Sequence, residues 1–559
     1  MLRMPDNSYM PLSKTYVFLA VILLAQAALL YTNLSDIPRW EWDDGVNMEV
    51  AWNLANGRMQ MYAITYPFVP HPPLFFAVLA ALLKTFGNKL IVLRSLTAAY
   101  ALLTTLLLYL IGRKIAGDRL GLAAAFLYAI YPENIYWSRI GMINSQLMLL
   151  TMLALYLFLR GGASRRLSYL TISLALATEF TAVALLISVI GILYLERKPG
   201  EIVWACVLSL ALPAATYAMI YSTPARDALI FDAGYALSRF LQNLWIFAAT
   251  FGLLALALLS RRRLKQLTAR SWENVKRIAV RDITFTFGRY GTWLLAQKPF
   301  AAVVAVNLFF AVRTLTPLSD DLLFMGYDKV FFDYYWVGAL GILVFGGSII
   351  RLFFLPLFLL TLALGRTDHM ILPLYPFFSL GLGMLLPRVH ESLTGILGDA
   401  RQGHAIGVIA LLLVYYPFAV ILVQDVRAFV YGAGLERQDV ESLMDVVAYV
   451  DDHTAPADVV LSTSHISRLV SAQGTELYQG LAAEGVTVSY FGEKLPESRF
   501  VYNSSYRGAR FVVLHNQTLA WLAEKQSLGD VSAELGAWPI VYRSERYVVY
   551  ANPYKRTPL

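Results

Sequence analysis

Long apolar runs separated by short polar segments fill residues 1–424. A transmembrane helix needs about 20 mostly apolar residues, and these runs predict a polytopic α-helical membrane protein with about 13 helices. One apolar stretch, 168–195, is broken at Thr178-Glu179. It is too long for one span and short for two, so it predicts a pair of short helices that enter and leave from one side. The other expected spans are 14–33, 90–111, 119–136, 142–160, 201–221, 243–260, 299–314, 334–350, 352–366, 371–387 and 405–424.

Basic residues between the spans predict the orientation of the chain. Arg113, Arg165, Arg197 and the basic run 261–281 all fall between apolar runs, and cytoplasmic loops carry an excess of Lys and Arg. The N-terminus is then cytoplasmic, and the first apolar run lacks a small-residue cleavage site and is kept as a span. We therefore expect an integral plasma-membrane protein whose loop 34–89 lies outside. Glu179 is expected on the cytoplasmic side.

Residues 425–559 change character. Val440, Leu443, Met444 and Val447 recur with helical spacing, and the segments 456–462, 509–514 and 547–551 have the composition of buried strands. The chain is therefore divided into a transmembrane module, 1–424, and an extracytoplasmic α/β domain, 425–559. No internal repeat is visible, so a transporter built from inverted halves gains no support.

Composition agrees with this division. The chain is 58% hydrophobic and 15% charged, against about 45–50% and about 25% in soluble domains. Residues 425–559 hold 12 basic and 16 acidic residues, so the net charge of +8 splits into −4 there and +12 in the remainder. Basic residues between apolar runs point to membrane lipids and phosphates and not to nucleic acid. The single cysteine, Cys206, excludes a disulfide framework.

The first outside loop holds the strongest candidate chemistry. Asp43 and Asp44 follow the first span directly and are flanked by Trp40 and Trp42. Such a segment can be a solvated turn with interfacial tryptophans. It can also hold a general base at the lipid–water boundary, where partial burial raises the pKa of a carboxylate.

The loop resembles that of the GT-C membrane glycosyltransferases, in particular the protein O-mannosyltransferase and aminoarabinose-transferase-like enzymes. The shared features are Asp-Asp-Gly-Val-Asn at 43–47, Gly57, His-Pro-Pro-Leu at 71–74, and Arg94 before the second span. The resemblance implies a polyprenyl-phosphate sugar donor, a catalytic site containing Asp43 and Asp44, and Asp43 as the base that deprotonates an acceptor hydroxyl.

The sequence also departs from that family. The family's second acidic residue follows the third span, where this chain has Asn144, and Glu133 is the candidate substitute. The aminoarabinose enzymes have Glu-Lys before Pro-Pro, whereas this chain has Pro70-His71. This difference argues against an identical metal site and against the same substrate.

Several basic residues and histidines are candidates for binding the donor phosphate, and each has a plainer alternative. His71 can contact a phosphate, ligate a metal or stabilise a turn. The arginines can neutralise a lipid phosphate or extend to the membrane surface. Besides His71, the candidates for this part of the site are Arg94, Arg139, Arg366, His369 and Glu133.

The combined expectation is an inverting glycosyltransferase that moves a monosaccharide from a polyprenyl phosphate to a hydroxyl acceptor on a protein, lipid or glycan. Two alternatives remain open: a flippase of a lipid-linked sugar, and an inactive scaffold with the same fold. The sequence contains no Walker loop and no dinucleotide fingerprint. It assigns no cofactor and leaves a divalent metal open.

Overall fold

The structure is a computed structural model of the chain. It describes residues 12–40, 42–57, 71–222, 226, 230, 234, 241, 335, 337–364, 368–397, 418–435, 437–477, 480–481, 484–486, 505–524 and 529–555. The expected spans 243–260 and 299–314, most of the expected span 405–424, the basic run 261–281 and Arg366 lie outside these ranges. The side chain of His369 is not described either. The expected helix count therefore stays a prediction.

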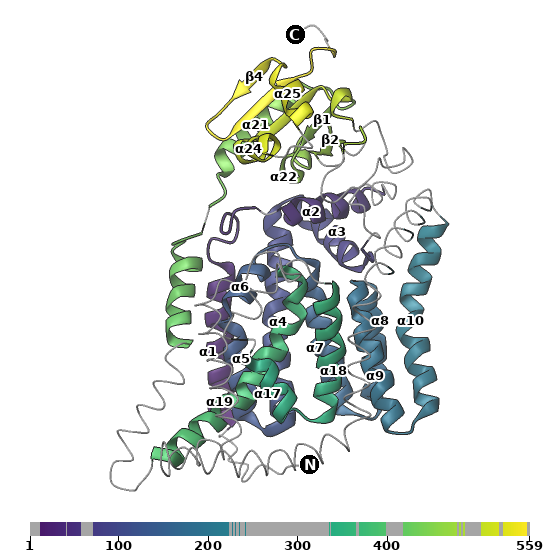
Figure 1. Cartoon of the computed structure of the whole chain (residues 1–559), viewed down its shortest axis with the longest axis vertical. Helices are drawn as coiled ribbons and strands as arrows, with labels where there is room; N and C mark the ends of the chain where they lie inside the picture. Colours follow the sequence, from purple (N-terminus) through teal and green to yellow (C-terminus); the bar gives the residue numbers. More distant parts are fainter. Residues whose placement is uncertain are drawn as a thin grey trace, which may run out of the picture.

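A bundle of apolar helices forms one half of the molecule (Figure 1). Its largest apolar cluster includes Leu108, Tyr128, Leu147, Phe353 and Phe378, all buried. Five of the described helices are long and apolar enough to cross a membrane. The helices of the bundle are α1 (Leu12–Tyr31), α4 (Leu90–Ala116), α5 (Asp118–Ala129), α6 (Pro132–Ser138), α7 (Ile143–Arg160), α8 (Ala163–Leu176), α9 (Val183–Leu195), α10 (Pro199–Tyr221), α17 (Val337–Phe345), α18 (Ser348–Leu364) and α19 (Tyr375–Leu397).

The expected spans 14–33, 90–111, 142–160, 201–221 and 371–387 coincide with the five described helices that are long and apolar enough to cross a membrane, and one expected span is corrected. The stretch 119–136 was expected to be a single span, but α5 ends at Ala129 and α6 begins at Pro132. Proline has no N–H to donate and is favoured at the first helical position, so it starts a new helix here. The chain thereby turns at Ile130 and Tyr131, and α6 ends at Ser138, directly before Arg139.

Two helices of the first loop lie across one end of the bundle. They are α2 (Trp42–Ala55) and α3 (Leu74–Phe86), and both stand between the bundle helices and the C-terminal domain (Figure 1). The apolar face of α3 buries Phe75, Leu79 and Leu83. Helices α2 and α3 of the first loop therefore form a packed layer of the fold.

The C-terminal domain contains a five-stranded mixed sheet in the order β2-β1-β3-β5-β4. Strand β1 pairs parallel with β2 and β3, and β5 pairs antiparallel with β3 and β4. The three expected strands are confirmed, while β2 and β4 were missed because they are short and half-polar. The elements are α21 (Val440–Asp452), β1 (Val459–Ser462), α22 (Ser464–Ser467), β2 (Gln473–Glu476), β3 (Phe511–His515), α24 (Asn516–Glu524), α25 (Gly529–Gly536), β4 (Ile540–Arg543) and β5 (Tyr547–Ala551).

The turn between α8 and α9 corrects the expected position of Glu179. The N–H of Leu74, at the start of α3, donates to the carbonyl of Ala177 at 3.0 Å. This bond places the turn at the same end of the bundle as the first loop, whereas the sequence predicted the opposite side. Helices α8 and α9 are short, with 14 and 13 residues against 27 in α4, and the chain reverses direction between them.

Replacement of Gly141 by alanine should destabilise the fold. A Cβ at this position would overlap the side chain of Leu93 on α4, and overpacking of this kind typically costs about 1–3 kcal/mol. We expect Gly141→Ala to lower the midpoint of thermal unfolding in detergent. Gly191→Ala, where a Cβ meets open space, is the matched control, and an equal midpoint for the two variants would contradict the packing described.

Candidate functional site

Asp44 is a buried residue that joins three parts of the chain. Its side chain is only 1% exposed, and its Oδ2 lies 2.6 Å from Nη2 of Arg94, which is itself 0% exposed. Its Oδ1 accepts a hydrogen bond of 2.8 Å from the backbone N–H of Gly141. A buried carboxylate that is held by a cation and by a backbone donor is anchored in one position. Asp44 thus connects α2 to α4 and to the turn between α6 and α7.

Arg94 uses all of its hydrogen-bond donors inside the protein. A guanidinium has five N–H groups. Two of them bond to Asp44, and the other three donate to the carbonyls of Leu34, Pro38 and Arg39 at 3.1, 2.9 and 3.3 Å. No donor is left for a lipid phosphate. The geometry favours a structural role for Arg94 over the phosphate-binding role that the sequence suggested.

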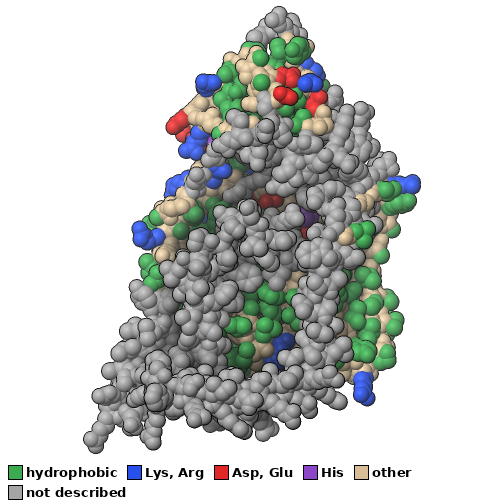
Figure 2. Space-filling view, viewed as in Figure 1, with side chains coloured by type: hydrophobic (Ala, Val, Ile, Leu, Met, Phe, Trp, Pro, Cys, Tyr) green, Lys and Arg blue, Asp and Glu red, His purple; other side chains and the backbone are tan. Residues whose placement is uncertain are grey.

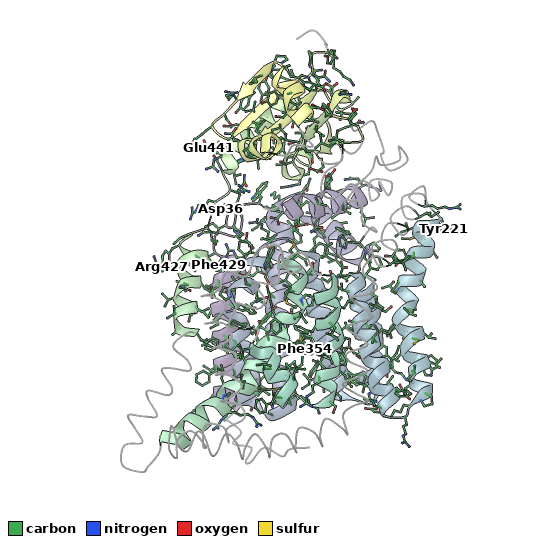
Figure 3. The ribbon with its side chains drawn as sticks, viewed as in Figure 1. Asp36, Tyr221, Phe354, Arg427, Phe429 and Glu441 are labelled. Atoms are coloured by element: carbon green, nitrogen blue, oxygen red, sulfur yellow. The ribbon has the colours of Figure 1, made fainter. Side chains whose placement is uncertain are left out.

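Arg139 has a similar environment. It is 0% exposed, and its guanidinium donates to the carbonyls of Leu29, Thr32 and Ile37. The guanidinium also lies 5.5 Å from the ring centroid of Phe429, which Figure 3 shows beside the bundle below Asp36. The two buried arginines together bind carbonyl groups from residues 29–39. These contacts fix the path of the chain as it leaves α1.

A second bond anchors α2 at Gly141. Nδ2 of Asn47 donates to the carbonyl of Gly141 at 2.6 Å, so both backbone groups of this glycine bind side chains of α2. Asp44 and Asn47 are three residues apart and share one helix face. Asp43 precedes Asp44 by about 100° of helix rotation, and its side chain is partly exposed.

Asp43, His71 and Glu179 form a cluster at this end of the bundle. Nδ1 of His71 and Oε2 of Glu179 are 2.8 Å apart. Burial lowers the pKa of His71, but the charge and hydrogen bond of Glu179 and the charge of Asp43 outweigh it, so the pKa is raised above its ordinary value. Figure 2 shows acidic side chains and a histidine in a hollow between the C-terminal domain and the apolar helices.

The position of Glu179 is fixed by its neighbours. Its Oε1 accepts a hydrogen bond from the N–H of Phe180 at 3.0 Å, which caps the short helix that follows. The preceding residue, Thr178, accepts a hydrogen bond from Gln146 of α7, and Gln146 accepts one from Tyr100 of α4. A network from α4 through α7 therefore orients the carboxylate that faces His71. The break in the apolar run at Thr178-Glu179 was the sequence signal for this residue.

The other expected site residues have less defined roles. Asn144 is buried in the first turn of α7, and Glu133 is half-buried in the first turn of α6. Among the described residues, no group of three or more His, Cys, Asp or Glu side chains is placed to hold a metal ion. The divalent metal left open by the sequence stays untested.

Part of the chain is similar to a known protein family. Residues 70–224 match the family model of dolichyl-phosphate-mannose-protein mannosyltransferases. No match is found among curated protein sequences. The matched segment begins just before His71 and includes Arg94, Arg139 and Glu179.

Two solved structures are similar over nearly the whole chain. The oligosaccharyltransferase of Archaeoglobus fulgidus, tethered with an acceptor peptide containing the NVT sequon, has a TM-score of 0.52 at 15% identity and covers 98% of this chain and 75% of its own. ArnT from Cupriavidus metallidurans, bound to undecaprenyl phosphate, has a TM-score of 0.50 at 13% identity. The similarity covers 97% of this chain and 98% of the ArnT chain. Both are GT-C fold glycosyltransferases.

The chain is therefore a multi-pass membrane protein with the GT-C fold. The resemblance to the mannosyltransferase and ArnT-like family, which the first loop suggested, is confirmed. At this level of identity the solved structures show the fold and leave the chemistry of the site to be argued from its residues.

Asp43 and Asp44 should differ in their effect on stability. Removal of one partner from a buried ion pair typically costs about 3–5 kcal/mol, so Asp44→Ala should lower the yield of folded protein and the midpoint of thermal unfolding. Asp43→Ala removes a partly exposed carboxylate and should leave the midpoint nearly unchanged. Size-exclusion profiles and thermal unfolding in the same detergent compare the two variants. Equal losses of folded protein and of unfolding midpoint would contradict the assignment of Asp44 as the residue that anchors α2.

Proposed function

We propose that this protein is an inverting glycosyltransferase that transfers a monosaccharide from a polyprenyl phosphate to a hydroxyl acceptor at the outer membrane face. The observation that carries the proposal is the cluster of Asp43, His71 and Glu179 at the end of the bundle where α2 and α3 form a layer. The similarity to a structure bound to undecaprenyl phosphate supports a lipid-linked donor. A site at the membrane boundary suits a donor whose long lipid tail stays in the bilayer.

Asp43 is the general base in this proposal. The acceptor oxygen attacks the anomeric carbon and forms a new glycosidic bond, while the bond from that carbon to the phosphate oxygen breaks and polyprenyl phosphate leaves. Asp43 takes the hydroxyl proton. A single displacement inverts the anomeric centre. Because the phosphate is already a good leaving group, the protein chiefly has to orient and deprotonate the acceptor.

The choice of Asp43 over its neighbour rests on their contacts. The carboxylate of Asp44 is held by Arg94 and by the N–H of Gly141, so both of its oxygens are engaged in contacts that anchor α2. Asp43 is partly exposed and its charge acts on His71. Asp44, Arg94 and Arg139 then position the loop, and Asp43 carries out the proton transfer.

His71 is the phosphate contact in this proposal. Glu179 and Asp43 favour its protonated form, and an imidazolium can donate a charge-assisted hydrogen bond to the phosphate that leaves. Glu179 orients the ring through Nδ1, so Nε2 is the nitrogen that remains for the donor.

Replacement of Asp43 by asparagine should abolish most turnover. General base catalysis contributes about 10²- to 10⁴-fold, and we expect Asp43→Asn to slow the release of polyprenyl phosphate by that factor in proteoliposomes supplied with labelled polyprenyl-phosphate mannose, glucose or arabinose. Binding of the labelled donor should persist. If the variant consumes donor at the wild-type rate, the base is another group. If the wild type consumes no donor but still binds it, the flippase or scaffold alternative is favoured.

The pH dependence of turnover should show the effect of Glu179 on the pKa of His71. The raised pKa of His71 means that activity is present at lower pH and is lost as pH rises through that pKa. Glu179→Gln removes the charge that raises the pKa, so the alkaline limb of the rate profile should move to lower pH. Glu196→Gln, at the far end of α9, is the control that should keep the wild-type limb. An unmoved limb in Glu179→Gln would exclude His71 as the titrating group.

A further inference from the structure

Tyr217 carries a buried hydroxyl group that the reaction described above does not use. The residue lies in α10, about one turn before the helix ends at Tyr221. The residue as a whole is partly exposed, but its hydroxyl is buried and, within the described part of the chain, has no hydrogen-bond partner. Buried tyrosine hydroxyls usually find a partner, because an unpaired one costs free energy. The hydroxyl of Tyr217 is therefore available to donate a hydrogen bond to a bound molecule.

Helix α10 is held against α8 in a register that places Tyr217 beside the turn between α8 and α9. The hydroxyl of Ser209 donates to the carbonyl of Tyr169 at 3.2 Å. The N–H of Leu212 donates to the hydroxyl of Ser173, also at 3.2 Å. These pairs are 40 and 39 residues apart in sequence, so the two helices run parallel. The same offset puts Tyr217 level with the end of α8, where the turn begins.

A direct ring contact agrees with this register. The rings of Tyr217 and Phe180 are stacked, with their centroids 5.9 Å apart and their planes at 22°. Phe180 directly follows Glu179 and donates its N–H to Oε1 of that carboxylate. The charge of Glu179 also acts on Tyr217, and its Oε2 lies 2.8 Å from His71. Tyr217 therefore lies at the same end of the bundle as the cluster of Asp43, His71 and Glu179.

The outer surface of α10 suits a lipid tail. Of the five described helices that are long and apolar enough to cross a membrane, α10 is the least buried, at 11%. Its exposed side chains include Val203, Trp204, Val207 and Met219. Figure 3 labels Tyr221 at the end of α10 that lies toward the C-terminal domain. A polyprenyl chain that lies along this helix would bring its phosphate to the level of that end.

We propose that Tyr217 is a donor-binding residue: its hydroxyl donates a hydrogen bond to the phosphate of the polyprenyl-phosphate sugar, beside the imidazolium of His71. This inference rests on the proposed function and adds a second contact for the same phosphate. A tyrosine hydroxyl keeps its proton at neutral pH and can donate it to an anion. A hydrogen bond to a charged acceptor is stronger than one between neutral groups, so the contact contributes mainly to donor affinity.

Replacement of Tyr217 by phenylalanine removes only the hydroxyl and keeps the ring that stacks with Phe180. In nanodiscs that contain the full chain, equilibrium binding of tritiated polyprenyl phosphate should weaken about tenfold in Tyr217→Phe, because a hydrogen bond to a charged group is lost. The midpoint of thermal unfolding of the ligand-free protein should not fall, because the unpaired hydroxyl does not stabilise it. Tyr221→Phe, on the same helix and 49% exposed, is the matched control and should equal the wild type in both measurements.

A lipid without the phosphate tests which group the hydroxyl contacts. A polyprenol of the same length should bind equally to the wild type and to Tyr217→Phe. The proposal is overturned if the wild type binds no polyprenyl phosphate, or if Tyr217→Phe binds it as tightly as the wild type, since water alone then satisfies the hydroxyl. It is also overturned if the affinity for polyprenol falls equally, or if the loss appears only with polyprenyl-phosphate mannose. The hydroxyl would then contact the tail or the sugar.

Turnover separates this inference from the proposed function. Tyr217→Phe should raise the KM for the donor about tenfold while kcat stays within about twofold, because the phosphate contact is present both before and during the transfer. If the wild type turns over no donor but the binding results hold, the phosphate contact stands and the proposed function fails. If the wild type transfers sugar and Tyr217→Phe keeps the wild-type KM, the proposed function stands and this inference fails.

Discussion

The buried contact between Asp44 and Arg94 is the interaction on which the site depends. The chain leaves α1 and turns through residues 32–40 before α2 begins. Carbonyls in such a buried turn need hydrogen-bond donors, because an unpaired buried polar group is costly. Arg94 and Arg139 supply these donors. Asp44 offsets the charge of Arg94 and anchors α2 to Gly141.

This constraint explains why two adjacent carboxylates have different environments. Neighbouring residues on a helix are separated by about 100°, so when Asp44 points to Arg94, Asp43 must point elsewhere. It is left partly exposed and within the electrostatic range of His71. Asp44 anchors the helix, and Asp43 lies on a different face of the same helix, where its charge acts on His71.

The sequence was sufficient for the helical pattern and for the segment that holds the site. Apolar length alone predicted α1, α4, α7 and α10, because hydrophobic spans have a strong signal. It was not sufficient for the contacts. Arg94 and Arg139 were expected at a phosphate, but a sequence does not show that the carbonyls of a turn 55 or more residues away take up their donors.

Glu179 was assigned to the wrong end of the bundle for a related reason. The orientation of a membrane protein is predicted from the basic residues in its loops. The turn between α8 and α9, at Thr178-Glu179, contains no basic residue, so this rule could not place it. Only the contacts of Leu74 and His71 with this turn reveal its position. The strands β2 and β4 were missed because their pairing partners, and not their own composition, define them.

In the proposed reaction, donor transfer takes place at the cluster of Asp43, His71 and Glu179. The most direct measurement is a structure, by electron cryo-microscopy in nanodiscs, of the Asp43→Asn variant with a polyprenyl-phosphate sugar bound. We expect density for the phosphate within hydrogen-bond distance of His71, with the sugar between His71 and residue 43 and the lipid tail in the bilayer. Density for the phosphate at the opposite end of the bundle, or away from both α2 and His71, would contradict it.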